Sequence, residues 1–275
     1  MLDWFWLALL VKMGASALIV VAASVLVERS GPFIGAMVAT LPISAGPAYV
    51  VLALDHGPDF LAASSLVSFA INAASILFLS LYAQLARRHS LLVSLSASYA
   101  LWLACAVAMI WIDASLPGVI AMNVAAFTIA FIVMRGRTRE GAVARKPAPR
   151  WWDLPARAIA VMGIVLLVVV VGRLFGPKAA GIAALAPVVL TSLALILHPR
   201  IGGEATSLVF AHALPGMVGF ALGLLVLHVS VIPLGSAAAL LLGLATCLVW
   251  NGLLVVMALK AVPRKAAAAE KRSRA

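Results

Sequence analysis

The chain has 275 residues, of which 65% are hydrophobic and only 11% are charged. Soluble domains carry about a quarter charged residues and under half apolar ones, so this composition excludes an ordinary soluble domain. The net charge of +11 would suggest nucleic acid in a soluble protein. Here the basic residues gather in the breaks between apolar runs, which favours contact with anionic lipid, and we predict no nucleic-acid partner.

Apolar runs long enough to cross the hydrocarbon core, roughly 20 residues as helix, recur along the whole chain. The first run has no basic segment before it, carries Asp3 there, and is interrupted by Lys12. These features differ from a signal peptide, so we expect a retained transmembrane helix. The pattern predicts an all-α membrane protein of nine spans, at 5–27, 32–54, 60–85, 91–112, 118–134, 156–174, 177–197, 205–228 and 236–259.

The basic residues indicate an orientation. If the connections alternate sides, one side collects 17 of the 20 Lys and Arg residues, and only Lys12, Arg173 and Lys178 lie elsewhere. Because basic residues accumulate on the cytoplasmic side, we expect a multi-pass membrane protein with one defined orientation. Its N-terminus should lie outside and its basic C-terminus in the cytoplasm.

The stretch from Gly31 to Pro47, GPFIGAMVATLPISAGP, combines an apolar composition with prolines that interrupt a helix. A second copy follows 145 positions later, where Gly31-Pro32 matches Gly176-Pro177 and Pro42 matches Pro187. The shared frame continues with Gly57 on Gly202 and Asp59 on Glu204. We interpret this frame as an internal duplication.

The two copies are the second and seventh spans, which cross the membrane in opposite directions. The prediction is therefore an inverted repeat of four, one and four helices, with a proline-broken helix in each half. The expected parts are a first repeat at 1–117, a connector helix and basic linker at 118–155, a second repeat at 156–262 and a basic tail at 263–275.

Broken helices leave backbone carbonyls free near the middle of the membrane, where protein, water or substrate must satisfy them. The candidate substrate-binding residues are the breaks themselves and the polar groups predicted inside spans. Each residue type also has a purely structural role. A proline can kink a helix, Ser and Thr can bond to the backbone, Asn can hydrogen-bond between helices, and His can bond to a neighbouring carbonyl. The candidates are Pro42, Ser44, Gly46, Asn72, Pro187, Thr191, Ser192, His212 and Asn251.

Gly31, Pro32, Gly35 and Pro42, which follow a helix that ends in VERS, resemble the GlpM-type small inner-membrane proteins of bacteria. The likeness covers about the first 85 residues, and this chain is twice as long as such proteins. The resemblance implies a protein of the bacterial inner membrane and a four-helix unit, here duplicated, with descent from a dual-topology dimer. It assigns no functional residue.

The sequence favours a transporter that moves a small, amphipathic or lipid-linked solute by alternating access. The alternative is a non-transporting membrane scaffold or assembly factor. H-E-x-x-H, G-x-S-x-G, P-loop and G-x-G-x-x-G motifs are absent from the sequence, so we predict no enzyme, no metal and no cofactor. The expected partners are membrane lipid and the unidentified solute, and a homodimer stays open.

Overall fold

The computed structural model describes residues 7, 10–18, 21, 45–113, 115–135 and 152–273, with the backbone alone for 153, 154, 156, 157, 160 and 258–273. These residues form helices and the turns between them, and the described part contains no strand. Residues 10–18 are helical. The helices that follow are α3 (Ala45–Asp55), α4 (Pro58–Leu85), α5 (Leu91–Trp111), α6 (Leu116–Val133), α7 (Asp153–Ala184) and α8 (Val188–Ser273).

Four stretches of the described chain are long and apolar enough to cross a membrane: α4, α5, α6 and Val161–Met257. The ends of α4, α5 and α6 lie within two residues of the predicted spans because each start carries a local signal. Ser90 and Ser115 cap α5 and α6 by accepting hydrogen bonds from Val93 N and Gly118 N. Pro58 and Pro117 occupy the first turns of α4 and α6, where a missing N–H costs nothing.

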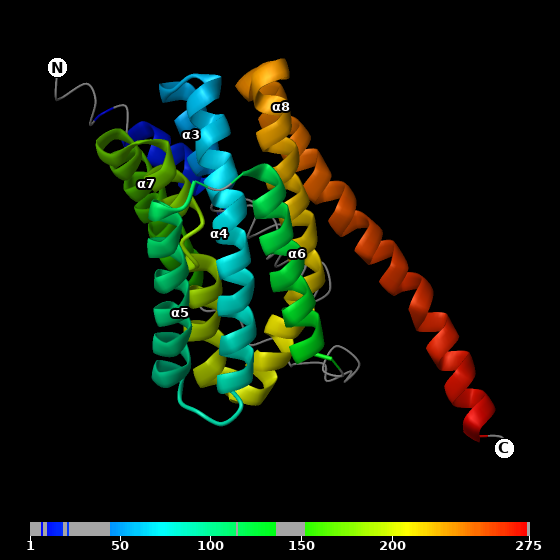
Figure 1. The fold of residues 1–275 in the computed structure, drawn as a ribbon. Coiled ribbons are helices and arrows are strands. Elements are labelled where there is room, and N and C mark those ends of the chain that lie inside the picture. Colours follow the sequence, from blue (N-terminus) through cyan, green and yellow to red (C-terminus); the bar gives the residue numbers. More distant parts are fainter. Residues whose placement is uncertain are drawn as a thin grey trace.

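Glycines with positive φ divide α7 and α8 into shorter helices. Gly176 (φ 81°) separates 153–175 from 177–184, while Gly202 (φ 82°) and Gly235 (φ 78°) divide α8 into 188–201, 203–234 and 236–273. The left-handed backbone conformation suits glycine because it has no Cβ. Figure 1 shows the consequence: after Gly235 the chain reverses direction, and the last helix then runs away from the bundle to the C-terminus.

The last helix differs from the prediction in length, since it continues to Ser273 rather than ending near residue 259. The additional segment is rich in Ala, Lys and Arg, which are good helix formers. Of the first two predicted spans, only 10–18 and α3 lie in the described part, together with residues 7 and 21. The structure therefore does not describe the copy of the motif from Gly31 to Ser44.

Helix α4 is the centre of the bundle and contacts α3, α5, α6, α7 and α8. In its most apolar 18-residue window 78% of the residues are buried, against 28% in α5 and 22% in α6. The buried face of α4 is nonetheless partly polar, because it carries Ser64, Ser65, Ser68, Asn72 and Ser75. Their spacing of three and four residues places them on one side of the helix.

Two close approaches of backbone bring the other helices against this centre. An added Cβ at Gly181, in the 177–184 helix, would lie 2.3 Å from Ser64 O, and one at Gly203 would lie 1.8 Å from Ala86 O. Such contacts are possible only for glycine. Between 203–234 and 236–273, Gly223 lies against Gly243 and Cys247, as small residues do where membrane helices pack closely.

Candidate functional site

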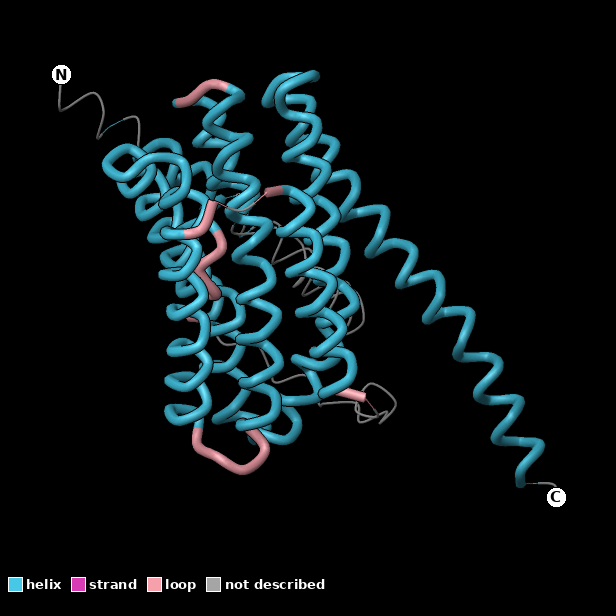
Figure 2. Tube along the Cα trace, viewed as in Figure 1, coloured by secondary structure: helices cyan, strands magenta, loops and turns pink. Residues whose placement is uncertain are grey.

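The helical path is broken before Pro187, within the height of the bundle rather than at its end (Figure 2). Helix α7 ends at Ala184 and α8 begins at Val188. The N–H of Leu185 bonds to Ile182 O at 3.2 Å and that of Ala186 bonds to Ala183 O at 3.1 Å. The last turn is therefore tightened to a three-residue spacing, and the carbonyl of Gly181 loses the N–H partner that a continuing helix would supply.

Hydroxyl groups supply donors to three carbonyls around the break. Ser68 Oγ donates to Gly181 O at 2.8 Å, and Ser75 Oγ donates to Leu185 O at 3.4 Å. Thr191 Oγ1 donates to Pro187 O at 2.7 Å. Ser68 and Ser75 come from α4, more than 100 residues earlier in the chain. Since unsatisfied backbone groups are costly where water is excluded, these bonds stabilise the broken conformation.

Each of these hydroxyls is in turn fixed by an aromatic donor. Tyr49 OH donates to Ser68 Oγ at 2.7 Å, and Trp102 Nε1 donates to Ser75 Oγ at 3.3 Å. Tyr99 OH lies 2.6 Å from Thr191 Oγ1. Because a hydroxyl has one proton and that of Thr191 goes to Pro187 O, Tyr99 is the donor of this pair. Three aromatic–hydroxyl–carbonyl chains therefore connect α3, α4 and α5 to the break.

Asn72 lies between Ser68 and Ser75 on α4 and is 0% exposed. Its Nδ2 donates to Asn123 Oδ1 on α6 at 2.9 Å. Asn123 Nδ2 donates to Phe69 O at 2.7 Å and Val119 O at 3.0 Å. Those two carbonyl partners fix the orientation of the Asn123 amide, so Asn72 must turn its Nδ2 toward Asn123. Its Oδ1 then points elsewhere and has no hydrogen-bond donor among the described residues.

The structure places the predicted site residues unequally. Pro187 and Thr191 form the break, and Asn72 lies on the α4 face that supplies hydroxyls to it. Gly46 is half-buried in the first turn of α3, while Pro42 and Ser44 lie outside the described residues.

The remaining predicted residues bond to their own helix. Ser192 Oγ donates to Val189 O at 2.9 Å, and Asn251 Nδ2 donates to Cys247 O at 2.9 Å. His212 Nδ1 lies 2.7 Å from Leu208 O, and its side chain is exposed. None of these three bonds joins its helix to the break.

Sequence reasoning missed the residues that support the break. On α4, polar residues recur at helical spacing, namely Ser64, Ser65, Ser68 and Ser75. This polar stripe is visible in the sequence and could have been used to find the residues that support the break. The aromatic donors Tyr49, Tyr99 and Trp102 carry no such signal, because their partners depend on how the helices pack.

Ion pairs join the helices at the two ends of the bundle. Lys12 pairs with Asp55, and Lys178 pairs with Asp113. Arg87 Nε lies 2.9 Å from Glu204 Oε2. The hydrogen bond from the Lys178 ammonium holds the pKa of the Asp113 carboxyl below its ordinary value. Lys178 and Asp113 lie next to connections that the predicted topology places on one side, as do Arg87 and Glu204, while Lys12 lies near the outer end of the first predicted span.

A hollow of about 270 Å³ lies beside the Asp113–Lys178 pair. Its wall is largely apolar, with Ala63, Leu66, Val67 and Ala70 of α4 facing Met109 and Ile112 of the α5 end, while Ser115 and the ion pair supply the polar groups. Pro187 and Asn72 are not part of this lining.

Long apolar helices that enclose a few buried polar side chains indicate the class of this molecule, an α-helical membrane protein. Comparison of the chain with protein-family models, with curated protein sequences and with solved structures finds no match. The resemblance to GlpM-type proteins stays a prediction. The arrangement has no nucleophile paired with a base among the residues that meet at the break, and its chemistry is hydrogen bonding to a polar group inside an apolar bundle.

Proposed function

We propose that the protein is a transporter of the bacterial inner membrane, which moves a small, amphipathic or lipid-linked solute by alternating access around its broken helices. The observation that carries this proposal is Asn72 Oδ1, a buried acceptor without a donor among the described residues, on the helix face that supports the break at Pro187. A polar atom left unpaired inside a membrane protein is costly and marks a functional position. A hydroxyl or amine of a solute would satisfy it.

The helix boundaries support the inverted repeat that this proposal includes. Gly57 and Ser90 precede α4 and α5 in the first half. Gly202 and Gly235, each 145 residues later, precede the helices 203–234 and 236–273. The offset is the one that relates the two proline motifs. Agreement of these helix starts with the motif offset favours a duplication of whole helices over a chance match of prolines.

The ion pairs support the proposed nine-span topology, with the N-terminus outside and the C-terminus in the cytoplasm. Lys12–Asp55 and Asp113–Lys178 would lie at the outer end, and Arg87–Glu204 at the cytoplasmic end. An error of one helix in the middle of the count would place Asp113 and Lys178, and likewise Arg87 and Glu204, on opposite sides.

Reporter fusions test the topology directly. Fusions after residue 145 and at the C-terminus are expected to report the cytoplasm, and fusions at residues 57 and 115 the outside, because the basic residues orient the chain. Finding both termini on one side would contradict the nine-span count and the inverted repeat together.

A membrane scaffold is the second candidate, and one observation favours it. The carbonyls of Gly181, Leu185 and Pro187 already receive hydroxyl donors from Ser68, Ser75 and Thr191, and Pro187 O also accepts the N–H of Thr191 at 2.9 Å. A break whose carbonyls are hydrogen-bonded within the protein could serve helix packing alone. The basic cytoplasmic surface would then carry the function.

Replacing Pro187 with Ala separates the two candidates. The change restores a backbone N–H at the break. If the break forms a transport site, we expect a lower transport rate per folded molecule with little loss of thermal stability. If the break serves packing, stability should fall while that rate is kept.

The solute must first be found by ligand-dependent thermal stabilisation across metabolites and lipids, and then followed by uptake into proteoliposomes. Pro58→Ala is the matched control because Pro58 lies in the first turn of α4, where its loss should affect neither quantity. An unchanged rate in Pro187→Ala would refute the transport site.

A further inference from the structure

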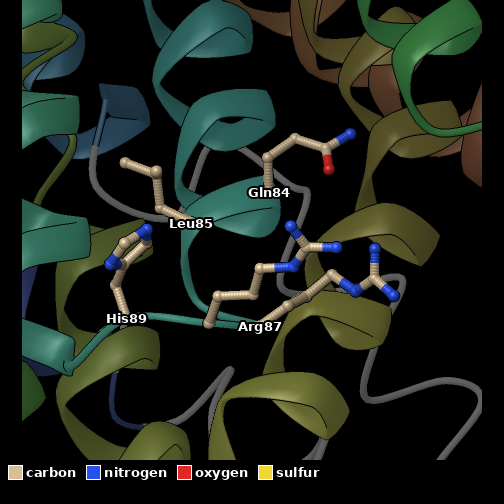
Figure 3. A pocket seen from close by; sticks show the side chains of 5 residues that line it. Gln84, Leu85, Arg87 and His89 are labelled. Carbon is tan, nitrogen blue, oxygen red and sulfur yellow. The ribbon is translucent and has the colours of Figure 1, made fainter.

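A second hollow, of about 330 Å³, opens where α4 ends and the chain turns into α5. It is lined by Gln84, Leu85, Arg87, Arg88 and His89. In Figure 3, Gln84 and Arg87 extend on one side of the helix end, and His89 lies beside Leu85 on the other. Since a water molecule takes up about 30 Å³ in the liquid, the space suits a polar group of several heavy atoms.

The arginines on this wall have hydrogen-bond donors to spare. Arg87 contacts both Glu204 carboxylate oxygens through Nε alone, at 2.9 and 3.2 Å. Its two terminal amino groups have no bond to any described residue, and Arg88 has no side-chain partner in that part of the chain. Gln84 Nε2 donates to Val133 O at 2.9 Å, and this bond fixes the Gln84 side chain in the wall of the hollow.

The hollow also lies at the end of an apolar helix that is long enough to cross a membrane. The apolar helix α4 ends at Leu85, immediately before the two arginines. A group at this position would lie at headgroup level of a membrane that α4 crosses. A guanidinium presents paired N–H donors that match phosphate oxygens.

We propose that this hollow binds the phosphate group of an anionic ligand, held by Arg87 and Arg88 with His89 on the opposite wall. The site is separate from the break at Pro187, and the proposal does not depend on transport. The phosphate can belong to a lipid headgroup or to a soluble phosphate ester, because both present the same oxygens to the two guanidinium groups.

A simpler role for the same residues is that their charge orients the protein and complements the negative C-terminal end of α4. That role depends on charge alone and would be shared by basic residues elsewhere on the same predicted side. A binding site depends on geometry. Variants that remove equal charge inside and outside the hollow therefore distinguish the two explanations.

The experiment uses the full-length protein in detergent, with thermal stabilisation and native mass spectrometry as readouts. The probes are phosphatidylglycerol in mixed micelles, with phosphatidylcholine as the zwitterionic comparison, and sn-glycerol 3-phosphate and inorganic phosphate in solution. The double variant Arg88→Gln/His89→Gln should bind roughly tenfold more weakly to whichever probe binds the parent protein, because it loses a charge-assisted hydrogen bond. Arg87 is left in place because its removal would leave Glu204 without its partner.

The matched control is Arg264→Gln, which removes one positive charge from the C-terminal tail, as Arg88→Gln does in the hollow, and should keep full binding. Arg88→Lys keeps the charge and the fold but loses the paired donors, so it should bind at an intermediate level. A response to phosphatidylglycerol alone would support the proposal with a lipid as the source, and a response to the soluble phosphates would support it with a soluble ester. No response to any probe, or an equal loss in the tail variant, would overturn it.

Discussion

Replacing Gly181 with Ala is expected to lower the stability of the folded protein by about 3 kcal/mol or more, because forced overpacking typically costs 1–3 kcal/mol and here the clash is with backbone. The new Cβ would lie 2.3 Å from Ser64 O and 3.1 Å from Val67 Cβ. The carbonyl of Ser64 belongs to α4 and cannot rotate away. The 177–184 helix would therefore have to move from α4, which would also break the bond from Ser68 Oγ to Gly181 O. Thermal unfolding in detergent measures the effect.

Gly163→Ala is the control for this change. Gly163 lies in the 153–175 helix of α7, and an added Cβ there meets nothing within 4 Å. Because Ala is the better helix former by up to about 1 kcal/mol, this variant should be as stable as the parent or slightly more so. Equal melting temperatures for the two alanine variants would contradict the close packing of 177–184 on α4.

The second large effect is expected at Asn72. Asn72→Leu removes the donor to Asn123 Oδ1 and leaves that buried oxygen unpaired, which should cost about 1–3 kcal/mol. The double variant Asn72→Leu/Asn123→Leu removes both partners and should recover part of this loss, since apolar replacement of a whole pair can be nearly neutral. Any compound that stabilises the parent by binding Asn72 Oδ1 should stabilise neither variant.

Ser80→Ala is the comparison for Asn72. Ser80 is also buried on α4, but its hydroxyl donates to Ile76 O within the same helix, at 2.8 Å. Its removal should leave ligand stabilisation intact. A compound that stabilises the Asn72→Leu/Asn123→Leu variant as strongly as the parent would remove Asn72 from the proposed site.

The helix positions and the break at Pro187 follow from local chemistry, so they could be predicted. Serine caps, prolines in first turns and the length of the apolar runs act within a few residues of where they are read. The break at Pro187 is present in the structure, where Thr191 donates to Pro187 O through both its N–H and its hydroxyl.

The support of the break could not be predicted in the same way. Ser68 meets Gly181 across 113 residues, and Tyr99 meets Thr191 across 92. Such contacts are decided by which helices are neighbours and how they are rotated about their axes. A single sequence contains the serine stripe of α4 but not the identity of the helix against which it packs.

The glycines at 176, 202 and 235 have a mechanical consequence. Each joins two helices through one residue outside helical geometry, so two backbone torsion angles form the whole joint. When one of these helices turns or tilts, the next helix must move with it, because a one-residue connection cannot absorb the displacement. In the first half, by contrast, α4 and α5 are separated by residues 86–90, and α5 and α6 by residues 112–115. Motion of one helix would therefore pass to the next across each of these glycines, within 153–184 and within 188–273, whereas residues 185–187 form a longer connection between these two segments.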